Sequence, residues 1–337
     1  MLRDIYNRPA RDLRISVTDR CNFRCMSCMP LDKYVWIERQ EILTYEEIAR
    51  LARLFVSLGV EKIRLTGGEP LLRRHLERLV AELAALAGLK DLCLSTNGAL
   101  LAEKAAALRA AGLRRINVSL ESLDPEKFRR ITQRGELNRV LEGLSAAKSE
   151  GLAPIKLNAV IERGVNDDEI LDLAEFARGN GFAIRFIEYM DVGNVNDWRP
   201  EKVFSKREIL VRIQSRYPLR EAPREDPTAP AVDYEFADGG GEVGVIASVS
   251  EPFCSACTRV RLTAEGKLVT CLFAETGRDL KALLRGGAGD EELKQAITSA
   301  WSSRDDRYSE QRFTQIQSGS GYQPGERKKI EMITLGG

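Results

Sequence analysis

The sequence predicts an α/β protein whose core is a partial (β/α)6 barrel of the TIM type, followed by a C-terminal extension. Apolar runs typical of strands recur about every 20 to 40 residues, and segments with helical periodicity separate them. Repeated β-then-α order at this spacing gives a parallel sheet with right-handed crossovers. Polar and glycine-rich residues consistently follow the strand-like runs, which favours the rim of a barrel over the single switch point of an open doubly wound sheet.

About six β/α units are expected, with strands over residues 13–17, 62–65, 91–94, 115–120, 155–161 and 183–188. The clearest helix begins after Thr44, because Thr44 and Glu47 form a capping-box signature, and its apolar period continues to Gly59. Residues 101–111 and 167–178 show the same 3.6-residue period.

A change of composition divides the chain after residue 217. Four prolines lie between residues 218 and 230 and three glycines follow at 239–241, as in a linker or an irregular connection. We therefore assign residues 1–217 to the barrel core and residues 218–337 to a C-terminal region. The glycines match part of a G-x-G-x-x-G pattern, but no βαβ unit surrounds them and a strand-like run follows. We expect a hairpin turn there rather than a dinucleotide site.

The charge balance argues against a nucleic-acid partner. Lys and Arg total 51 against 50 Asp and Glu, so the net charge is +1 and any anion site must be local. The N-terminus has no apolar signal region, and no stretch approaches the roughly 18 apolar residues of a spanning helix. We expect a cytoplasmic protein without a membrane partner.

Seven cysteines fall into two groups of three and one single residue. In a reducing compartment such grouping favours metal ligation over disulfides. The single residue, Cys93, lies in an apolar strand-like run and is expected to be a small core residue. The only histidine, His75, follows two arginines, and we expect a solvated surface imidazole. Most acid–base and nucleophile schemes that depend on histidine are thereby removed.

Cys21, Cys25 and Cys28 form the first group. This spacing lets three thiolates bind three corners of one 4Fe-4S cluster, so that the fourth iron has no protein ligand. A zinc site would normally take four ligands, and an electron carrier of the ferredoxin type would take a fourth cysteine. An iron-sulfur cluster with one open iron is therefore the favoured interpretation.

This loop, together with Gly67-Gly68-Glu69-Pro70, resembles the C-x3-C-x2-C and GGEP motifs of the radical S-adenosylmethionine superfamily. The resemblance implies that the open iron chelates S-adenosyl-L-methionine, which is cleaved to a 5′-deoxyadenosyl radical. Four residues fall at the family's cofactor positions: Ser27, Gly68, Ser119 and Met190. Ser27 stands where the family usually has an aromatic residue, so we expect another apolar residue, Met190, to support the adenine.

Cys254, Cys257 and Cys271 form the second group. A second 4Fe-4S cluster with an open iron is the preferred reading, and zinc with a distant fourth ligand is the alternative. In an extended segment Arg259 and Arg261 lie on the same face beside this cluster, where paired guanidiniums suit phosphate oxygens. The alternative for the two arginines is a solvated strand face.

The two cysteine groups, the segment Thr18–Pro30, the Arg-x-Arg pair and the final Gly336-Gly337 together resemble the GTP 3′,8-cyclase family of molybdenum cofactor biosynthesis. The resemblance implies abstraction of the ribose 3′ hydrogen of GTP and attack of the C3′ radical on C8. Reduction and protonation then give (8S)-3′,8-cyclo-7,8-dihydroguanosine 5′-triphosphate. The resemblance also places GTP between the two clusters, with the guanine bound to the open iron of the second cluster.

By the same resemblance the substrate-binding residues are Arg14, Arg64, Ser95, Lys156, Arg259 and Arg261. Arg14, Arg259 and Arg261 are expected to be catalytic, and the diglycine end is expected to reach into the active site. The implied partners are a reductant for the clusters and a cyclic pyranopterin monophosphate synthase that converts the product. The sequence leaves a homodimer open.

Two other functions compete with this expectation. A peptide-modifying radical enzyme would use C-terminal clusters as an electron relay, but such enzymes usually carry more than three C-terminal cysteines. A regulatory protein with two three-cysteine sites would need a nucleic-acid-binding module, and the sequence resembles none.

Overall fold

One continuous sheet organises the computed structural model, which describes residues 1–29, 34–319, 322–323, 325 and 327–336. The strands of the described chain follow the order β12-β11-β10-β1-β2-β3-β4-β5-β6-β9-β8-β7. Their bounds are β1 Asp12–Ser16, β2 Lys62–Thr66, β3 Asp91–Thr96, β4 Arg115–Ser119, β5 Ile155–Ile161, β6 Ala183–Glu188, β7 Leu219–Glu221, β8 Val232–Phe236, β9 Glu242–Ile246, β10 Arg259–Leu262, β11 Lys267–Val269 and β12 Arg278–Asp279.

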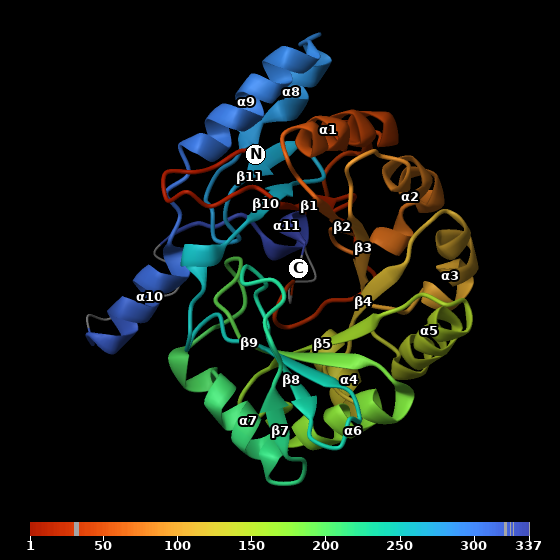
Figure 1. Ribbon diagram of the computed structural model, residues 1–337, viewed down its shortest axis with the longest axis vertical. Helices are drawn as coiled ribbons and strands as arrows, with labels where there is room; N and C mark the ends of the chain where they lie inside the picture. Colours follow the sequence, from red (N-terminus) through yellow and green to blue (C-terminus); the bar gives the residue numbers. More distant parts are fainter. Residues whose placement is uncertain (30–33, 320–321, 324, 326, 337) are drawn as a thin grey trace.

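The middle of the sheet is parallel, from β10 through β1 to β6 and on to β9. The strands curve into an open ring with helices outside it (Figure 1). The six strands expected from the sequence lie side by side in chain order, so the parallel α/β core is confirmed. The C-terminal region adds a further parallel strand at each edge, β9 beside β6 and β10 beside β1.

The helices are α1 Tyr45–Ser57, α2 Leu76–Ala84, α3 Leu101–Ala110, α4 Pro125–Thr132, α5 Leu137–Ser149, α6 Ile170–Asn180, α7 Lys206–Gln214, α8 Leu280–Arg285, α9 Asp290–Ser302, α10 Tyr308–Gln317 and α11 Met332–Leu335. Thr44 accepts from the backbone of Glu47 and the Glu47 side chain accepts in return, which confirms the capping box. His75 precedes α2 and exposes 62% of its side chain, as expected for a surface imidazole.

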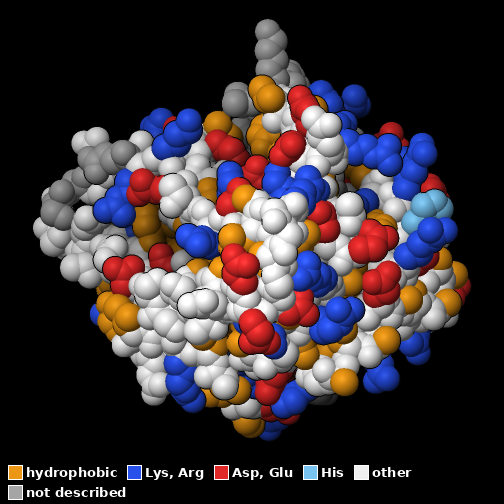
Figure 2. Space-filling model, turned by 90° about the horizontal axis from the view of Figure 1, so that it is seen from above, with side chains coloured by type: hydrophobic (Ala, Val, Ile, Leu, Met, Phe, Trp, Pro, Cys, Tyr) orange, Lys and Arg blue, Asp and Glu red, His pale blue; other side chains and the backbone are white. Residues whose placement is uncertain are grey.

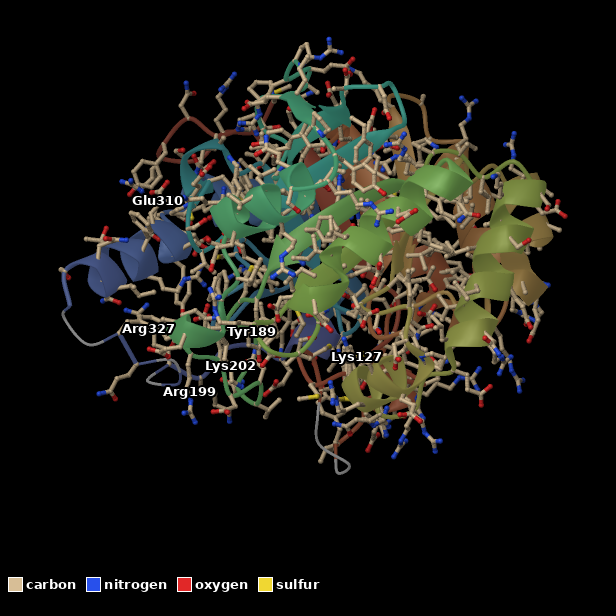
Figure 3. The ribbon with its side chains drawn as sticks, turned by 90° about the horizontal axis from the view of Figure 1, so that it is seen from below. Lys127, Tyr189, Arg199, Lys202, Glu310 and Arg327 are labelled. Atoms are coloured by element: carbon tan, nitrogen blue, oxygen red, sulfur yellow. The ribbon has the colours of Figure 1, made fainter. Side chains whose placement is uncertain are left out.

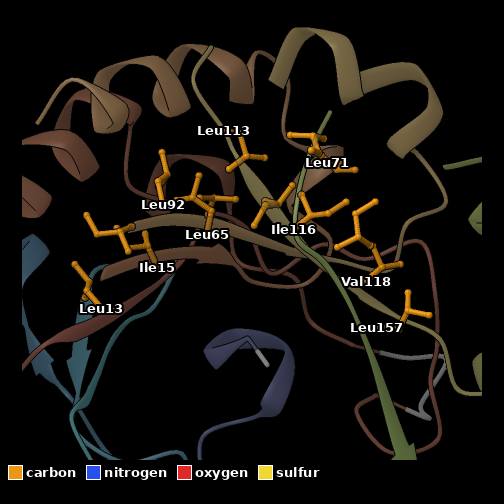
Figure 4. Close-up of a cluster of buried hydrophobic side chains, with 14 of the residues drawn as sticks. Leu13, Ile15, Leu65, Leu71, Leu92, Leu113, Ile116, Val118 and Leu157 are labelled. Carbon is orange, nitrogen blue, oxygen red and sulfur yellow. The ribbon is translucent and has the colours of Figure 1, made fainter. Parts of the chain in front are cut away.

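The core lies between the strands and the outer helices. Side chains alternate along each strand, and the apolar set, including Leu13, Ile15 and Leu65, is buried against the helices (Figure 4). The other set faces the inside of the ring and is largely polar. Cys93 is buried, but its thiol lies beside the amide oxygen of Asn117 on this inner face, and it is absent from the apolar core cluster.

The C-terminal region supplies three features that bear on the site. The strands β8 and β9 form the expected hairpin, and Gly239 and Gly241 in its turn have φ values of +78° and +120°. The short helix α11 lies inside the ring of strands (Figure 1). No helix in the described part of the chain combines the length and apolar character needed to cross a bilayer. Acidic and basic side chains are intermingled on the face shown in Figure 2.

Candidate active site

The first cysteine loop follows the carboxyl end of β1 and is anchored by α4. The amides of Arg24 and Met26 donate to the carbonyls of Thr132 and Ile131 at 2.9 and 3.0 Å. Burial raises the pKa of the Cys21 thiol to about 11 and that of Cys28 to about 12. Burial also raises the pKa of Cys25, and the nearby Glu121 carboxyl and the two other thiols of the loop raise it further.

These thiols would ionise only beside a strong positive charge, which bound iron would provide. The donor set, three soft sulfur ligands on one short loop, fits an iron-sulfur cluster with one open iron. In the described part of the chain, no three His, Cys, Asp or Glu side chains lie close enough together to hold a single metal ion.

The glycines after β2 bring this strand against the segment that leads into the cysteine loop. Gly67 has a φ of +128°, and an added Cβ would lie 2.3 Å from the carbonyl oxygen of Thr18. A Cβ on Gly68 would lie 2.3 Å from the carbonyl oxygen of Arg20. The closest approach of both glycines is therefore to the protein's own backbone. Ser27 lies in the cysteine loop and is partly exposed.

Two carboxyls and an amide lie near this loop, and none of them was given a site role from the sequence, although Glu69 belongs to the GGEP motif. Glu69 accepts hydrogen bonds from the Thr96 hydroxyl and the Asn97 amide, both at 2.7 Å, and burial raises its pKa to about 7. Asn97 also directs its side-chain nitrogen toward Cys21, with 3.9 Å between that nitrogen and the sulfur. Burial raises the pKa of Glu121 to about 7 as well, and this residue follows Ser119 at the end of β4. Glu69, Asn97 and Glu121 each follow a strand closely, and this position is the sequence signal that could have assigned them to the site.

The second cysteine group lies toward the other end of the strands. Cys257 stands two residues before Arg259, the first residue of β10, and Cys271 follows the end of the antiparallel strand β11. Cys254 and Cys257 are the ends of one tight turn, because the amide of Cys257 donates to the carbonyl of Cys254 at 3.1 Å. Since β10 runs parallel to β1, this group and the first cysteine loop lie at opposite ends of the barrel strands.

Arginines surround the second group. Arg259 directs Nε and Nη2 at the Cys257 sulfur, at 3.3 and 3.1 Å. Burial alone would raise the pKa of Cys257, but Arg259 and Arg304 outweigh burial and hold the pKa at about 6. Arg304 also donates to the Cys257 carbonyl at 2.9 Å, and Arg8 donates to the Cys254 carbonyl at 2.8 Å. No motif marked Arg8 or Arg304, because their role depends on contacts between distant segments.

A row of guanidiniums crosses the inner face of the sheet between the two cysteine groups. Arg14 pairs in register with Arg261 of β10 on one side and with Arg64 of β2 on the other. Neighbouring strands lie about 4.8 Å apart, so the row spans about 10 Å. None of the three forms an ion pair with a carboxylate of the described residues.

The electrostatics of this row favour an anion. Burial and the charges of Arg261 and Arg64 lower the pKa of Arg14 well below its ordinary value. Burial and Arg259 lower the pKa of Arg261 to about 10. The Nε atoms of Arg14 and Arg64 are buried without a hydrogen-bond partner in the described structure. Arg64 does reach the hydroxyl of Ser95, at 3.5 Å. Uncompensated buried cations of this kind are suited to phosphate.

A cavity of about 650 Å³ opens beside this row at the amino ends of the strands. Of the residues predicted from the sequence, it brings together Arg64, Lys156 and Arg259; Arg14 and Arg261 are not among its lining residues. Arg11 and Arg224 line it from outside the strands, and three further cations that were not predicted line it from the strands: Lys62, Arg115 and Arg185. They occupy inward strand positions, so the alternation of the strands was the signal that could have found them.

The C-terminal tail enters the barrel near the row. Arg261 donates to the carbonyl of Gly336 at 2.7 Å, and an added Cβ on Gly336, whose φ is +67°, would lie 2.4 Å from Cγ2 of Thr66. The expected approach of the tail to the site is therefore seen for Gly336, whereas Gly337 lies outside the described residues. Met190 follows β6, and its carbonyl accepts from the side chain of Asn196 at 2.8 Å.

Known proteins resemble this chain along its whole length. Residues 15–177 match the model of the Radical SAM superfamily, and residues 182–310 match Molybdenum Cofactor Synthesis C. The GTP 3′,8-cyclase of Acidothermus cellulolyticus is 50% identical over 100% of this chain and 99% of its own. The chain belongs to the GTP 3′,8-cyclase family. Family proteins of the same name from Xanthomonas axonopodis pv. citri and Staphylococcus aureus are 47% and 45% identical, each over 100% of this chain and 99% of theirs.

Solved structures with a similar fold share little sequence identity with this chain. Streptococcus suis SuiB bound to S-adenosylmethionine aligns with a TM-score of 0.61 and 17% identity, over 90% of this chain and 68% of that one. The protein anSMEcpe with bound AdoMet aligns with a TM-score of 0.55 and 14% identity, over 93% of this chain and 94% of that one. These likenesses concern the fold alone and agree with a partial barrel.

Proposed function

We propose that this protein converts GTP to (8S)-3′,8-cyclo-7,8-dihydroguanosine 5′-triphosphate, the first step of molybdenum cofactor biosynthesis. Membership of the family gives the reaction. The observation that carries the proposal in this chain is the guanidinium row of Arg261, Arg14 and Arg64 between two three-cysteine groups. A substrate with a triphosphate would supply the negative charge that the row lacks.

The radical chemistry belongs to the end of the barrel at which the strands finish. Cys21, Cys25 and Cys28 would hold a 4Fe-4S cluster, with S-adenosyl-L-methionine beside Ser27, Gly68, Ser119 and Met190. When bound, this pair supplies a carbon-centred radical that can remove a ribose hydrogen. The chain's part is to fix the cofactor between these residues and to exclude water from the ring.

We assign the positioning of GTP to residues on the inner face of the sheet. Arg14, Arg64, Lys156, Arg259 and Arg261 would bind and orient the triphosphate, with the Ser95 hydroxyl beside Arg64. The cavity adds Lys62, Arg115 and Arg185 to this set. C8 of guanine and C3′ of the ribose belong to the same nucleotide, so the contribution of the binding site is to hold the conformer in which these two atoms lie close together.

Cys254, Cys257 and Cys271 would hold the second 4Fe-4S cluster in the C-terminal region. Their three thiols, with Arg259 and Arg304 nearby, suit an anionic cluster whose open iron takes the guanine. We assign residues 1–217 to the radical core and residues 218–337 to the second cluster and the tail. Support comes from the change of composition at residue 218, whereas the two family models change over earlier, between residues 177 and 182.

The proposed setting follows from this chemistry. Iron-sulfur ligation by free cysteines fits the reducing cytoplasm. A reductant must deliver electrons, and a cyclic pyranopterin monophosphate synthase would convert the product.

Anaerobic reconstitution followed by turnover tests the proposal. We expect about eight irons per chain, from two four-iron clusters, and 5′-deoxyadenosine formed with S-adenosyl-L-methionine and dithionite only when GTP is present. The cyclised nucleotide should form in equal amount. Bound zinc, or equal turnover with other nucleotides, would contradict the proposal.

A further inference from the structure

We propose that Asp191, just after the carboxyl end of β6, is a positioning residue that holds the C-terminal tail inside the barrel. The predicted effect of Asp191 on turnover rests on the proposed function, whereas the prediction that Asp191 holds the tail in place does not. Asp191 is 1% exposed and directly follows Met190, which we assign to the cofactor site.

Side chains from the C-terminal region converge on this carboxylate. Arg312 of α10 donates to Oδ1, and the hydroxyls of Tyr308 and Tyr322 point at Oδ2. Lys329 donates to Oδ2 at 2.7 Å and to the Asp191 backbone carbonyl at 2.6 Å. One acidic side chain thus joins α10 to the segment that leads into the tail.

The charges in this group are buried, and one carboxylate lies between two cations. The side chain of Arg312 is fully buried and that of Lys329 is 3% exposed. Burial would raise the pKa of Asp191, but Arg312 and Lys329 outweigh burial and lower the pKa to about 2. Asp191 therefore stays ionised at neutral pH, and its loss would leave two cations buried without their partner.

A second residue of the same loop holds the chain at the same point. The side-chain oxygen of Asn194 accepts from the Lys329 amide at 2.9 Å, and its nitrogen donates to the Lys329 carbonyl and to Glu331, both at 2.7 Å. From there one turn of helix, α11, leads to Gly336, which Arg261 binds inside the barrel. The segment from Lys329 to Gly336 is thus held at both of its ends, at Lys329 by Asp191 and Asn194 and at Gly336 by Arg261.

The loop that carries Asp191 is itself firmly held. Trp198 donates to the Tyr189 carbonyl at 2.8 Å, and both rings belong to a small apolar cluster against which Tyr322 packs. Figure 3 shows Tyr189 and its loop neighbours on the same side of the molecule as Arg327 of the C-terminal segment. This rigid loop contacts the cofactor site through Met190 and the tail through Asp191. It would therefore fix the position of the tail relative to the cofactor site.

The test compares Asp191→Asn with Asp197→Asn in the full-length, reconstituted enzyme. Asp197 lies in the same loop, but it is exposed, and among the described residues it forms ion pairs with Arg199 and Lys202, each at 3.3 Å. Hydrogen–deuterium exchange of residues 327–336 reports the tail, and steady-state kinetics report turnover. We expect Asp191→Asn to raise tail exchange at least tenfold and to lower kcat at least tenfold, with KM for S-adenosyl-L-methionine within twofold; Asp197→Asn should change neither.

A second variant guards against general misfolding. Lys329→Met removes the link on the tail side and leaves Asp191 paired with Arg312, so tail exchange should rise while exchange in β1 to β6 keeps its wild-type pattern. Wild-type tail exchange in Lys329→Met, or in a folded Asp191→Asn, would overturn the proposal even if activity fell. If the wild-type enzyme forms no cyclised nucleotide, the proposed function fails, and tail exchange still decides the role of Asp191.

Discussion

Arg261 donates a hydrogen bond of 2.7 Å to the carbonyl oxygen of Gly336, so one guanidinium contacts the C-terminal tail. The same residue pairs in register with Arg14 and belongs to the row that we assign to the triphosphate. Tail and substrate site therefore share a side chain. A shift of the tail would redirect the Arg261 guanidinium that we assign to the substrate, so Gly336 has a physical role through its backbone carbonyl.

Arg261→Ala removes both contacts at once. Hydrogen bonds to charged groups are worth about 1.5 to 3 kcal/mol, so kcat/KM for GTP should fall by about 10- to 150-fold. Arg261→Lys keeps the charge but not the fork and should recover part of the loss. Arg220→Ala, at a side chain 75% exposed on the β7–β8 hairpin, serves as the control. Unchanged kcat/KM in Arg261→Ala would contradict the assignment of the row.

Gly336→Ala tests the fit of the tail. Its Cβ would lie 2.4 Å from Thr66 and 2.7 Å from the amide of Gly67, in a left-handed backbone conformation that alanine disfavours. We expect the tail to be displaced and kcat to drop at least tenfold, with the iron content unchanged. Gly179→Ala in α6, where an added Cβ meets no atom within 4 Å, should keep full activity. Full activity of Gly336→Ala would show that the tail position is unimportant.

The sequence predicted those parts of the site that depend on local pattern. The spacing of Cys21, Cys25 and Cys28 needs only one loop, and alternation in an extended segment is enough to place Arg259 and Arg261 on one face. The row itself needs more, because Arg261 meets Arg14 only when β10 pairs with β1. A strand-like run predicts a strand, but it does not say which distant strand lies beside it.

The residues that the sequence did not reveal act through contacts between distant segments. Asp191 follows a strand, as many loop residues do. Its partners lie far along the chain, in α10 and at Tyr322 and Lys329. Arg304 lies in a polar stretch after α9, yet it contacts the backbone of Cys257. Cys93 has the pattern of a core residue, but the register places it between Arg64 and Arg115 on the inner face. Each of these roles depends on tertiary packing.

Glu69 should make stability depend on pH near neutrality. Burial raises its pKa to about 7, from an ordinary value of 4.5, so its contribution is fully present below about pH 4.5 and is lost as the pH rises through 7. The loss is at most about 3 kcal/mol. Thermal unfolding of the anaerobic enzyme from pH 5 to 8 should show the decline, and Glu69→Gln should reduce its slope by about half, because Glu121 has a similarly raised pKa. Glu201→Gln, at an exposed carboxyl, should keep the wild-type slope; the same slope in Glu69→Gln would exclude Glu69 as the cause.

Asp226 should weaken GTP binding in the wild-type enzyme. It lies in the proline-rich segment that lines the cavity, and its carboxylate pairs with Lys62 at 2.6 Å, so it neutralises a cation that would otherwise face the substrate. Asp226→Asn should lower KM for GTP several-fold at low salt, and the gain should shrink as ionic strength rises, because screening weakens attraction between exposed charges. Asp238→Asn breaks a surface pair with Arg178 on the nearby hairpin and should leave KM unchanged. If KM rises in Asp226→Asn, the pair acts instead by holding the segment closed, and charge competition at Lys62 is excluded.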